Sequence, residues 1–179
     1  MLKKTTWHGV VAMDEMGAIG MNEKLPWHLP LELAHFKNLT INQTICLGNK
    51  TYRSFKGPLP NRIHFVLSRS DNVGFEDRDY GREKKIIYFS RLDHLIDKAE
   101  SQFENIFVCG GATIYAQLMP YISIWHRTTV HTKINGATTF FPKMNWTKWK
   151  VVEKKLVKED SIPWTYEKLE RINPLQFGS

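Results

Sequence analysis

The fold is decided by a stretch in two parts, Ala12-Met13-Asp14-Glu15-Met16-Gly17-Ala18-Ile19-Gly20 and Leu25-Pro26-Trp27-His28-Leu29-Pro30-Leu31-Glu32-Leu33-Ala34-His35-Phe36-Lys37. It predicts the end of a strand, a long loop and a helix. Pro30 suits the first helical position, because the N–H that proline lacks is not needed there. A long loop with two glycines and a tryptophan is typical of an active-site lid, although Trp27 could also simply fill the core.

The helix carries an acid on its apolar face. The residues at helical spacing on this face are Leu29, Glu32, Leu33, Phe36 and Leu39. A buried carboxylate is costly unless it is paired or protonated. Glu32 in a first helical turn also has a structural explanation, because it interacts favourably with the helix dipole. The loop favours the catalytic interpretation, since it delivers Trp27 beside the one acid of the apolar face.

Composition limits the class of protein. The chain has 179 residues, 42% of them hydrophobic, as in one soluble globular domain. It contains no apolar run that could span a membrane and no apolar stretch typical of a signal peptide, so we expect a cytoplasmic protein. Cys46 and Cys109 are expected to be reduced. The net charge of +7 favours an anionic partner, whether nucleic acid, nucleotide or polycarboxylate, or else reflects only a solvated basic surface.

Strand-like and helix-like segments alternate along the chain. The predicted strands before the last ones are Thr6–Met13, Thr44–Leu47, Arg62–Leu67, Ile86–Phe89, Ile106–Cys109 and Ile122–Thr132. This order predicts the α/β class, with a mostly parallel central β-sheet flanked by helices on both faces, in a single domain over residues 1–179. Trp149–Val157 and Trp164–Ile172 predict an antiparallel C-terminal hairpin at the sheet edge. The polar segment from Asp71 to Lys85 predicts a surface loop.

Two strand–glycine–helix junctions suggest an anion site. They are Leu47-Gly48-Asn49-Lys50-Thr51 and Cys109-Gly110-Gly111-Ala112-Thr113. Free backbone N–H groups at such junctions bind phosphates, although glycine can serve only tight packing there. Neither junction matches GxGxxG or a P-loop. Lys50 and Ser68-Arg69 add positive charge and a hydroxyl at the same predicted sheet edge, where they would suit the 2′-phosphate of NADPH, although each could also be ordinary surface charge.

The run quoted at the outset closely resembles the N-terminal signature of bacterial dihydrofolate reductases, and the resemblance covers nearly the whole chain. It implies a monomeric enzyme that uses NADPH to reduce 7,8-dihydrofolate to 5,6,7,8-tetrahydrofolate, with hydride delivered to C6 and a proton to N5. Glu32 would bind the pterin and handle the proton, and Leu25 and Trp27 on the lid would exclude water. The expected raised pKa of Glu32 suits this role.

The same resemblance assigns the remaining site residues. Besides Glu32, the implied substrate-binding residues are Val10, Leu33, Phe36, Lys37, Phe55, Leu59, Arg62 and Thr129. Arg62 would hold the carboxylate of the folate tail, and Thr129 would hydrogen-bond Glu32. The implied cofactor-binding residues are Ala12, Ile19, Gly20, Lys50, Thr51, Ser68, Arg69, Cys109, Gly110, Gly111, Ala112, Thr113, Ile114 and Tyr115. A cis peptide bond between Gly110 and Gly111 is also implied. Asn49 and Thr138 depart from the family pattern, which usually has an arginine and an acid there.

Two other functions stay open. A pyrimidine reductase of riboflavin synthesis shares the implied fold, but it would need neither the Trp27 and Glu32 combination nor Arg62. A basic nucleic-acid-binding module rests on the net charge alone, and no nucleic-acid-binding motif is present. The seven histidines form no pattern with metal-ligand spacing, so we predict no metal site.

Overall fold

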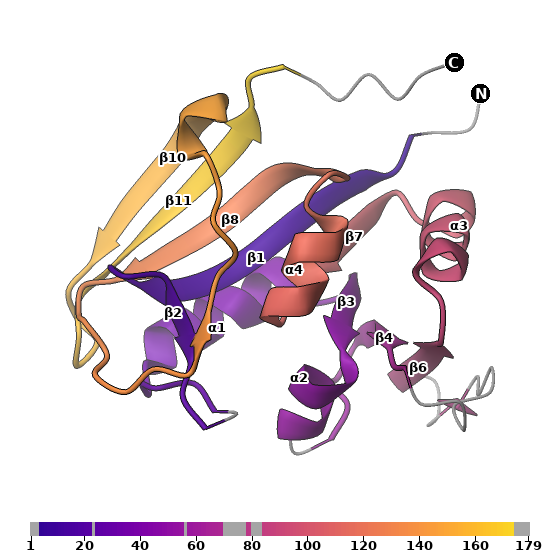
Figure 1. Cartoon of the computed structure of the whole chain (residues 1–179), viewed down its shortest axis with the longest axis horizontal. Coiled ribbons are helices and arrows are strands. Elements are labelled where there is room, and N and C mark those ends of the chain that lie inside the picture. Colours follow the sequence, from indigo (N-terminus) through magenta and orange to yellow (C-terminus); the bar gives the residue numbers. More distant parts are fainter. Residues whose placement is uncertain (1–3, 23, 56, 70–77, 80–83, 174–179) are drawn as a thin grey trace.

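The computed structural model describes residues 4–22, 24–55, 57–69, 78–79 and 84–173. Its centre is a nine-stranded sheet in the order β10-β11-β8-β1-β7-β3-β4-β6-β5 (Figure 1). The strands of this sheet are β1 (Thr6–Asp14), β3 (Thr44–Gly48), β4 (Arg62–Leu67), β5 (Arg78–Asp79), β6 (Lys84–Phe89), β7 (Asn105–Val108), β8 (Ile122–Val130), β10 (Trp149–Val157) and β11 (Trp164–Arg171). The helices are α1 (Pro30–Thr40), α2 (Asn49–Ser54), α3 (Leu92–Gln102), α4 (Ala112–Leu118) and the 3₁₀ helix η1 (Trp146–Lys148).

The strand directions confirm the predicted fold class. β1 is parallel to β7 and β8, β3 is parallel to β7 and β4, and β4 is parallel to β6. Among the described residues, the antiparallel pairings of this sheet are β5 with β6, β8 with β11, and β10 with β11, and the last of these forms the predicted hairpin at one edge. The carboxyl ends of β1, β3, β4 and β7 therefore meet at one edge of the sheet, where the connecting segments can build a site.

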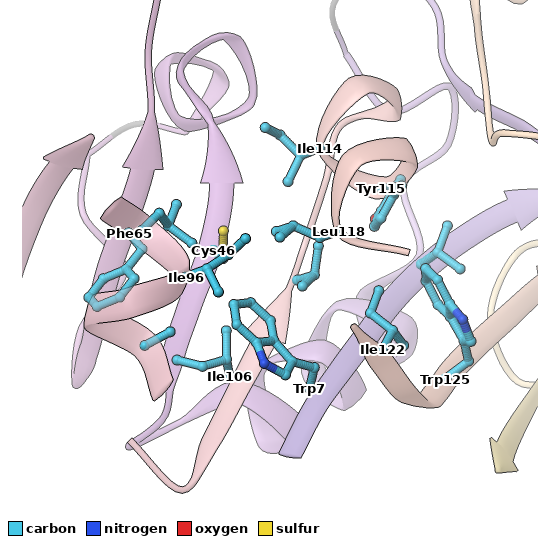
Figure 2. Packing of buried hydrophobic residues seen from close by; sticks show 14 of the residues in the cluster. Trp7, Cys46, Phe65, Ile96, Ile106, Ile114, Tyr115, Leu118, Ile122 and Trp125 are labelled. Carbon is cyan, nitrogen blue, oxygen red and sulfur yellow. The ribbon is translucent and has the colours of Figure 1, made fainter. Parts of the chain in front are cut away.

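Apolar side chains cover both faces of the sheet, because successive residues of a strand point to opposite sides. One face packs against α3 and α4, and its core includes Trp7, Phe65 and Trp125 (Figure 2). Trp125 lies flat over Gly9 of β1, where an added Cβ would come within 2.3 Å of the indole. The other face carries Ile45, Leu47 and Phe107 and packs against side chains of α1 and α2.

Three short strands were not predicted. β2 (Ala18–Gly20), within the expected loop, pairs with β9 (Thr139–Phe140). The expected loop from Asp71 to Lys85 is wrong at β5, which pairs with β6, and residues 71–77 and 80–83 lie outside those described. A strand of two or three residues is too short to show an alternation of polar and apolar residues. Such strands form through pairing with segments that are distant in sequence. No helix in the described part of the chain is long and apolar enough to cross a membrane.

Candidate active site

Glu32 lies in the first turn of α1, near the carboxyl ends of the central strands, and is buried. Its surroundings raise its pKa from 4.5 to about 7. Burial is the main cause, and the negative charge of Asp160 adds to it, while a hydrogen bond from the Thr128 side chain acts in the opposite direction. Glu32 can therefore gain and lose a proton near neutral pH, which a general acid or base requires.

The predicted partner of Glu32 on β8 is wrong by one residue. Thr128, rather than Thr129, hydrogen-bonds the carboxyl group. Thr128 pairs with Ala12 of β1 and is buried, whereas Thr129 is the next residue along the strand and points to the opposite face. Because the two threonines are adjacent, the sequence alone does not show which of them points to the face of the sheet that carries Glu32.

An apolar wall continues from Glu32 along α1. Val10 forms a buried cluster with Ile45, Leu47 and Phe107, and partly buried side chains pack against it. The latter are Phe36, Leu39, Tyr52, Phe55, Leu59 and Cys109. The structure thus groups four of the predicted substrate residues, namely Val10, Phe36, Phe55 and Leu59. Leu33, which the sequence places on the same helix face, has a side chain that is 54% exposed. The helix turns Glu32 inward and leaves Leu33 at the border of the apolar face.

Arg62, at the start of β4, is buried and held by several bonds. Its Nε donates to Thr40 Oγ1 at 2.9 Å, and its terminal nitrogens donate to the carbonyl oxygens of Pro60 (2.8 Å) and Lys37 (3.2 Å). A guanidinium has five N–H donors, so two more can bind a carboxylate in fixed geometry. Burial lowers its pKa. Lys37 itself has an exposed side chain on the last turn of α1.

The segment between β1 and α1 is anchored by a residue that the sequence interpretation left without a role. Asp14 is buried at the end of β1, and its Oδ1 accepts hydrogen bonds from the N–H groups of Met16 and Ala18, both at 2.8 Å. Its Oδ2 accepts one from Ile134 N–H at 2.8 Å, in the loop after β8. Asp14 therefore ties the base of this segment to the loop that leads to β9. Its position before a glycine-containing turn was the available signal.

The far end of the same segment carries the two predicted lid residues. Trp27 packs against a cluster that includes Leu29, Val130 and Trp164, next to the first turn of α1. Its indole N–H is buried and has no partner among the described residues, a state it shares with Trp7 and Trp125 in the main core. Leu25 is exposed. Ile19 is partly buried against the main core, and Gly20 packs against Thr139 of β9.

The two glycine junctions lie side by side. β3 and β7 are neighbours, Cys109 N–H donates to the Cys46 carbonyl at 2.8 Å, and Gly48 N–H donates to the Gly110 carbonyl at 2.9 Å. The Gly110–Gly111 peptide bond is cis, as the resemblance implies. The backbone N–H groups that begin α2 and α4 thus gather at one place on the sheet edge.

Close packing explains why glycine occupies both positions of the second junction. Gly110 has φ +104°, and an added Cβ would lie 3.1 Å from the Tyr115 hydroxyl. At Gly111 an added Cβ would lie 3.2 Å from Thr51 Oγ1, which brings this predicted residue of α2 into the group. Tyr115 is buried and donates a hydrogen bond to the Val10 carbonyl at 2.6 Å, so α4 is fixed to β1 between the two predicted binding regions.

Two exposed basic side chains lie near this junction, one on α2 and one just after β4. Lys50 is exposed in the first turn of α2, and Arg69 is exposed just after β4. Ser68 is buried beside it, with its N–H donating to the Phe89 carbonyl at 2.8 Å. A ligand with several phosphates fits this edge, because adjacent backbone donors and nearby positive charge are what such a ligand requires. The predicted cofactor residues from Ala12 to Tyr115 thus come from the ends of β1, β3, β4 and β7 and from the elements that follow them.

Comparisons with known proteins agree with this arrangement. The family model described as dihydrofolate reductase matches residues 7–171. The dihydrofolate reductase of Lactococcus lactis is 33% identical over 168 residues, covering 92% of this chain and 96% of that protein. The corresponding protein of Bacillus subtilis is 34% identical over 159 residues, covering 88% of this chain and 89% of its own.

A solved structure is also similar over almost the whole fold. It is dihydrofolate reductase from Enterococcus faecalis, complexed with NADP(H) and RAB-propyl. The TM-score is 0.81 at 29% sequence identity, and the match covers 94% of this chain and 97% of that chain. The sheet, the helices and the terminal hairpin are therefore shared with a protein whose cofactor-bound form is known.

Proposed function

Because the chain belongs to the dihydrofolate reductase family, whose members reduce 7,8-dihydrofolate to tetrahydrofolate with NADPH, we propose that this reaction takes place at the Glu32 pocket. The observation that carries the proposal is a carboxyl group with a pKa of about 7, at the head of an apolar wall that ends near Arg62. A flat heterocycle with a carboxylate tail matches this order of an acid, an apolar wall and a buried arginine.

Glu32 has two tasks in this proposal. Its two oxygens accept hydrogen bonds from the 2-amino group and N3 of the pterin, which orients the ring. The carboxyl group also takes up a proton near neutral pH and raises the basicity of the ring, and a water molecule delivers the proton to N5. Turnover should therefore decline as the pH rises through the pKa of Glu32. Trp27 and Leu25 exclude bulk water from the pocket.

The residues of the two glycine junctions would hold NADPH. Backbone N–H groups around Gly48 and Gly110–Gly111, together with Thr51, suit the diphosphate, and Lys50, Ser68 and Arg69 suit the 2′-phosphate. When bound, NADPH supplies the hydride that reaches C6 of the pterin. Tyr115, anchored on Val10, holds α4 against β1 where the two regions meet.

The carboxylate tail would bind at the other end of the pocket. The three bonds from Arg62 to Thr40, Pro60 and Lys37 fix its guanidinium before any ligand arrives. The side chain therefore loses little conformational entropy when a tail carboxylate binds to it. Phe36, Phe55 and Leu59 would contact the benzoyl ring, and Lys37 would add positive charge outside. Leu33 would cover the pocket from its exposed position at the border of α1.

The direct test is NADPH oxidation by the purified protein, followed by absorbance, with 7,8-dihydrofolate and in parallel with the pyrimidine substrate of riboflavin synthesis. We expect turnover with dihydrofolate only. Turnover with the pyrimidine substrate alone would assign the other reductase function. Added DNA or RNA should leave the rate unchanged, because we infer no role in nucleic-acid binding.

Cofactor selectivity gives a second test. Replacing Lys50 and Arg69 together by alanine removes two charge-assisted contacts and should weaken NADPH binding by about 100-fold. NADH binding should change little, because NADH lacks the 2′-phosphate. Lys150→Ala, at an exposed site on β10, is the matched control. An equal loss for NADPH and NADH would show that the two cations act on the fold instead.

We also propose that the protein acts as a monomer in the cytoplasm. Both of its cysteines, Cys46 and Cys109, are free thiols, which suits a reducing compartment. Gel filtration with light scattering would test the monomeric state.

A further inference from the structure

Asp160 lies in the turn between β10 and β11, far from α1 in sequence, yet its carboxylate contacts the first turn of that helix. Oδ1 accepts a hydrogen bond from Leu31 N–H and Oδ2 accepts one from Glu32 N–H, each at 3.1 Å. The indole N–H of Trp164 donates to the same Oδ2 at 2.8 Å. One of the two bonded residues on the helix is therefore the proposed acid itself.

These bonds complete the N-terminus of α1. A helix begins with backbone N–H groups that have no partner within the helix. Leu29 is the N-cap residue and its side chain makes no capping bond. Pro30 has no N–H, and Leu33 N–H donates to the Leu29 carbonyl at 2.9 Å. Within the first turn itself, Leu31 and Glu32 are the two residues whose N–H groups have no partner in the helix, and Asp160 accepts from both.

The charge of Asp160 also acts on Glu32. The start of a helix has a partial positive charge, which would favour the ionised form of an acid in the first turn. Asp160 offsets that charge and repels the ionised carboxylate of Glu32. For Asp160 itself, burial opposes ionisation, but the bonds from Trp164, Leu31 and Glu32 outweigh it and lower its pKa.

We propose that Asp160 is a positioning residue for Glu32: from the β10–β11 turn it holds the first turn of α1 and sets the charge balance in which Glu32 handles its proton. This inference rests on the proposed function for its effect on turnover. Its effect on the ionisation of Glu32 can be measured without turnover.

Few other groups near Glu32 could produce the same effect. On β8 the neighbour is Thr128, which does not titrate, and on α4 it is Tyr115, whose pKa burial raises far above neutral. β1 contributes Val10 and Ala12, which do not titrate. His28 is exposed, and its charge acts on Asp160. Asp160 is thus the acidic group whose charge acts on Glu32 from another element.

The experiment measures the pKa of Glu32 in the ligand-free protein by carbon-13 NMR of its carboxyl group, and the basic limb of the turnover profile, in Asp160→Asn. Asparagine removes the charge and one of the two acceptor oxygens. We expect both the pKa and the limb to fall by about 0.5 to 1 pH unit. Glu159→Gln is the control, because it makes the same charge change at the adjacent residue, whose carboxylate accepts a hydrogen bond from Lys158 N–H. It should change neither the pKa of Glu32 nor the basic limb of the turnover profile.

Trp164→Phe provides a second variant that keeps the charge of Asp160 and removes the indole donor, together with part of the ring that packs beside Leu29 and Trp27. It should shift the pKa in the same direction by less than half as much, because the carboxylate is then held less firmly. It also serves if Asp160→Asn does not fold. An unchanged Glu32 pKa in whichever of these variants fold, or a shift in Glu159→Gln equal to that in Asp160→Asn, would overturn the proposal. Wild-type protein without dihydrofolate turnover would instead count against the proposed function.

Discussion

Two buried titratable sites lie on the same face of the sheet, and they differ in how their polar atoms are hydrogen-bonded. One site is the carboxyl group of Glu32. The other is a pair of buried histidines, His8 on β1 and His126 on β8, with His8 Nδ1 and His126 Nε2 3.1 Å apart. His8 Nε2 lies 3.1 Å from Asn105 Oδ1, and His126 Nδ1 lies 3.0 Å from the Tyr166 hydroxyl. All four ring nitrogens of the pair thus have a partner.

The contrast lies in how much hydrogen-bonding capacity is left over. The contacts of the pair form one consistent chain, in which Tyr166 donates to His126, His126 donates to His8, and His8 donates to Asn105. Among the described residues, Thr128 is the side chain that bonds the carboxyl group of Glu32, which can accept several hydrogen bonds. A buried polar group whose atoms are all satisfied stabilises a fold, whereas one with capacity left can bind a ligand.

The two groups also make stability depend on pH in opposite directions. Burial raises the pKa of Glu32 above its unfolded value, so its contribution is fully present below about pH 4.5 and is lost as the pH rises towards 7. Burial lowers the pKa of His8 and, together with the charges of His8, Lys168 and His35, lowers that of His126 to about 3. The contribution of the pair is therefore present above about pH 6.5 and is lost as the pH falls.

The largest expected effect is that of Glu32→Gln. The amide cannot exchange a proton near neutral pH, so turnover should fall by about 10²- to 10⁴-fold, and NADPH binding should persist. The same change removes the cost of ionising a buried acid, so at pH 8 the free energy of unfolding should rise by up to about 3 kcal/mol. Stopped-flow turnover and urea unfolding measure the two quantities. Near-normal turnover at pH 7 would remove Glu32 from the proton chemistry.

The second prediction concerns the histidine pair. Between about pH 6.5 and pH 5, the buried neutral imidazole of His126 should lower the free energy of unfolding by up to about 2 kcal/mol, and that of His8 should act in the same direction. Replacing both His8 and His126 by leucine should flatten this slope, while costing about 1 to 3 kcal/mol at neutral pH through the unpaired Tyr166 and Asn105. Urea unfolding followed by tryptophan fluorescence measures both effects.

His94, exposed on α3, supplies the control for the pair. His94→Gln should leave the acid-side slope as in the wild type. If the double leucine variant also kept the wild-type slope, the folded pair would bind protons as readily as the unfolded chain does. The contrast with Glu32 would then fail, because the pair would make no pH-dependent contribution to stability.

The difference between the two groups could be predicted only in part. Helical spacing placed Glu32 on the inner face of α1, and the order of strands and helices gave the sheet, because both depend on local patterns. His8 and His126 are 118 residues apart, and their contact depends on the register of β1 against β8. Asp160 reaches α1 from a turn whose conformation depends on the packing of Trp164. Such contacts have no signal within one short window of sequence.

The choice between Thr128 and Thr129 allows the smallest and most specific test. Thr128→Val keeps the shape of the side chain and removes the hydroxyl that favours the ionised form of Glu32. The pKa of Glu32 should therefore rise further, by about 0.5 pH unit, and the basic limb of turnover should move up with it. Thr129→Val makes the same chemical change one residue on, where the side chain points to the other face of the sheet. Its profile should match the wild type. A shift caused by Thr129→Val alone would return the hydrogen bond to the residue that the family pattern indicated, and would mean that β8 pairs with β1 one residue out of the register described here.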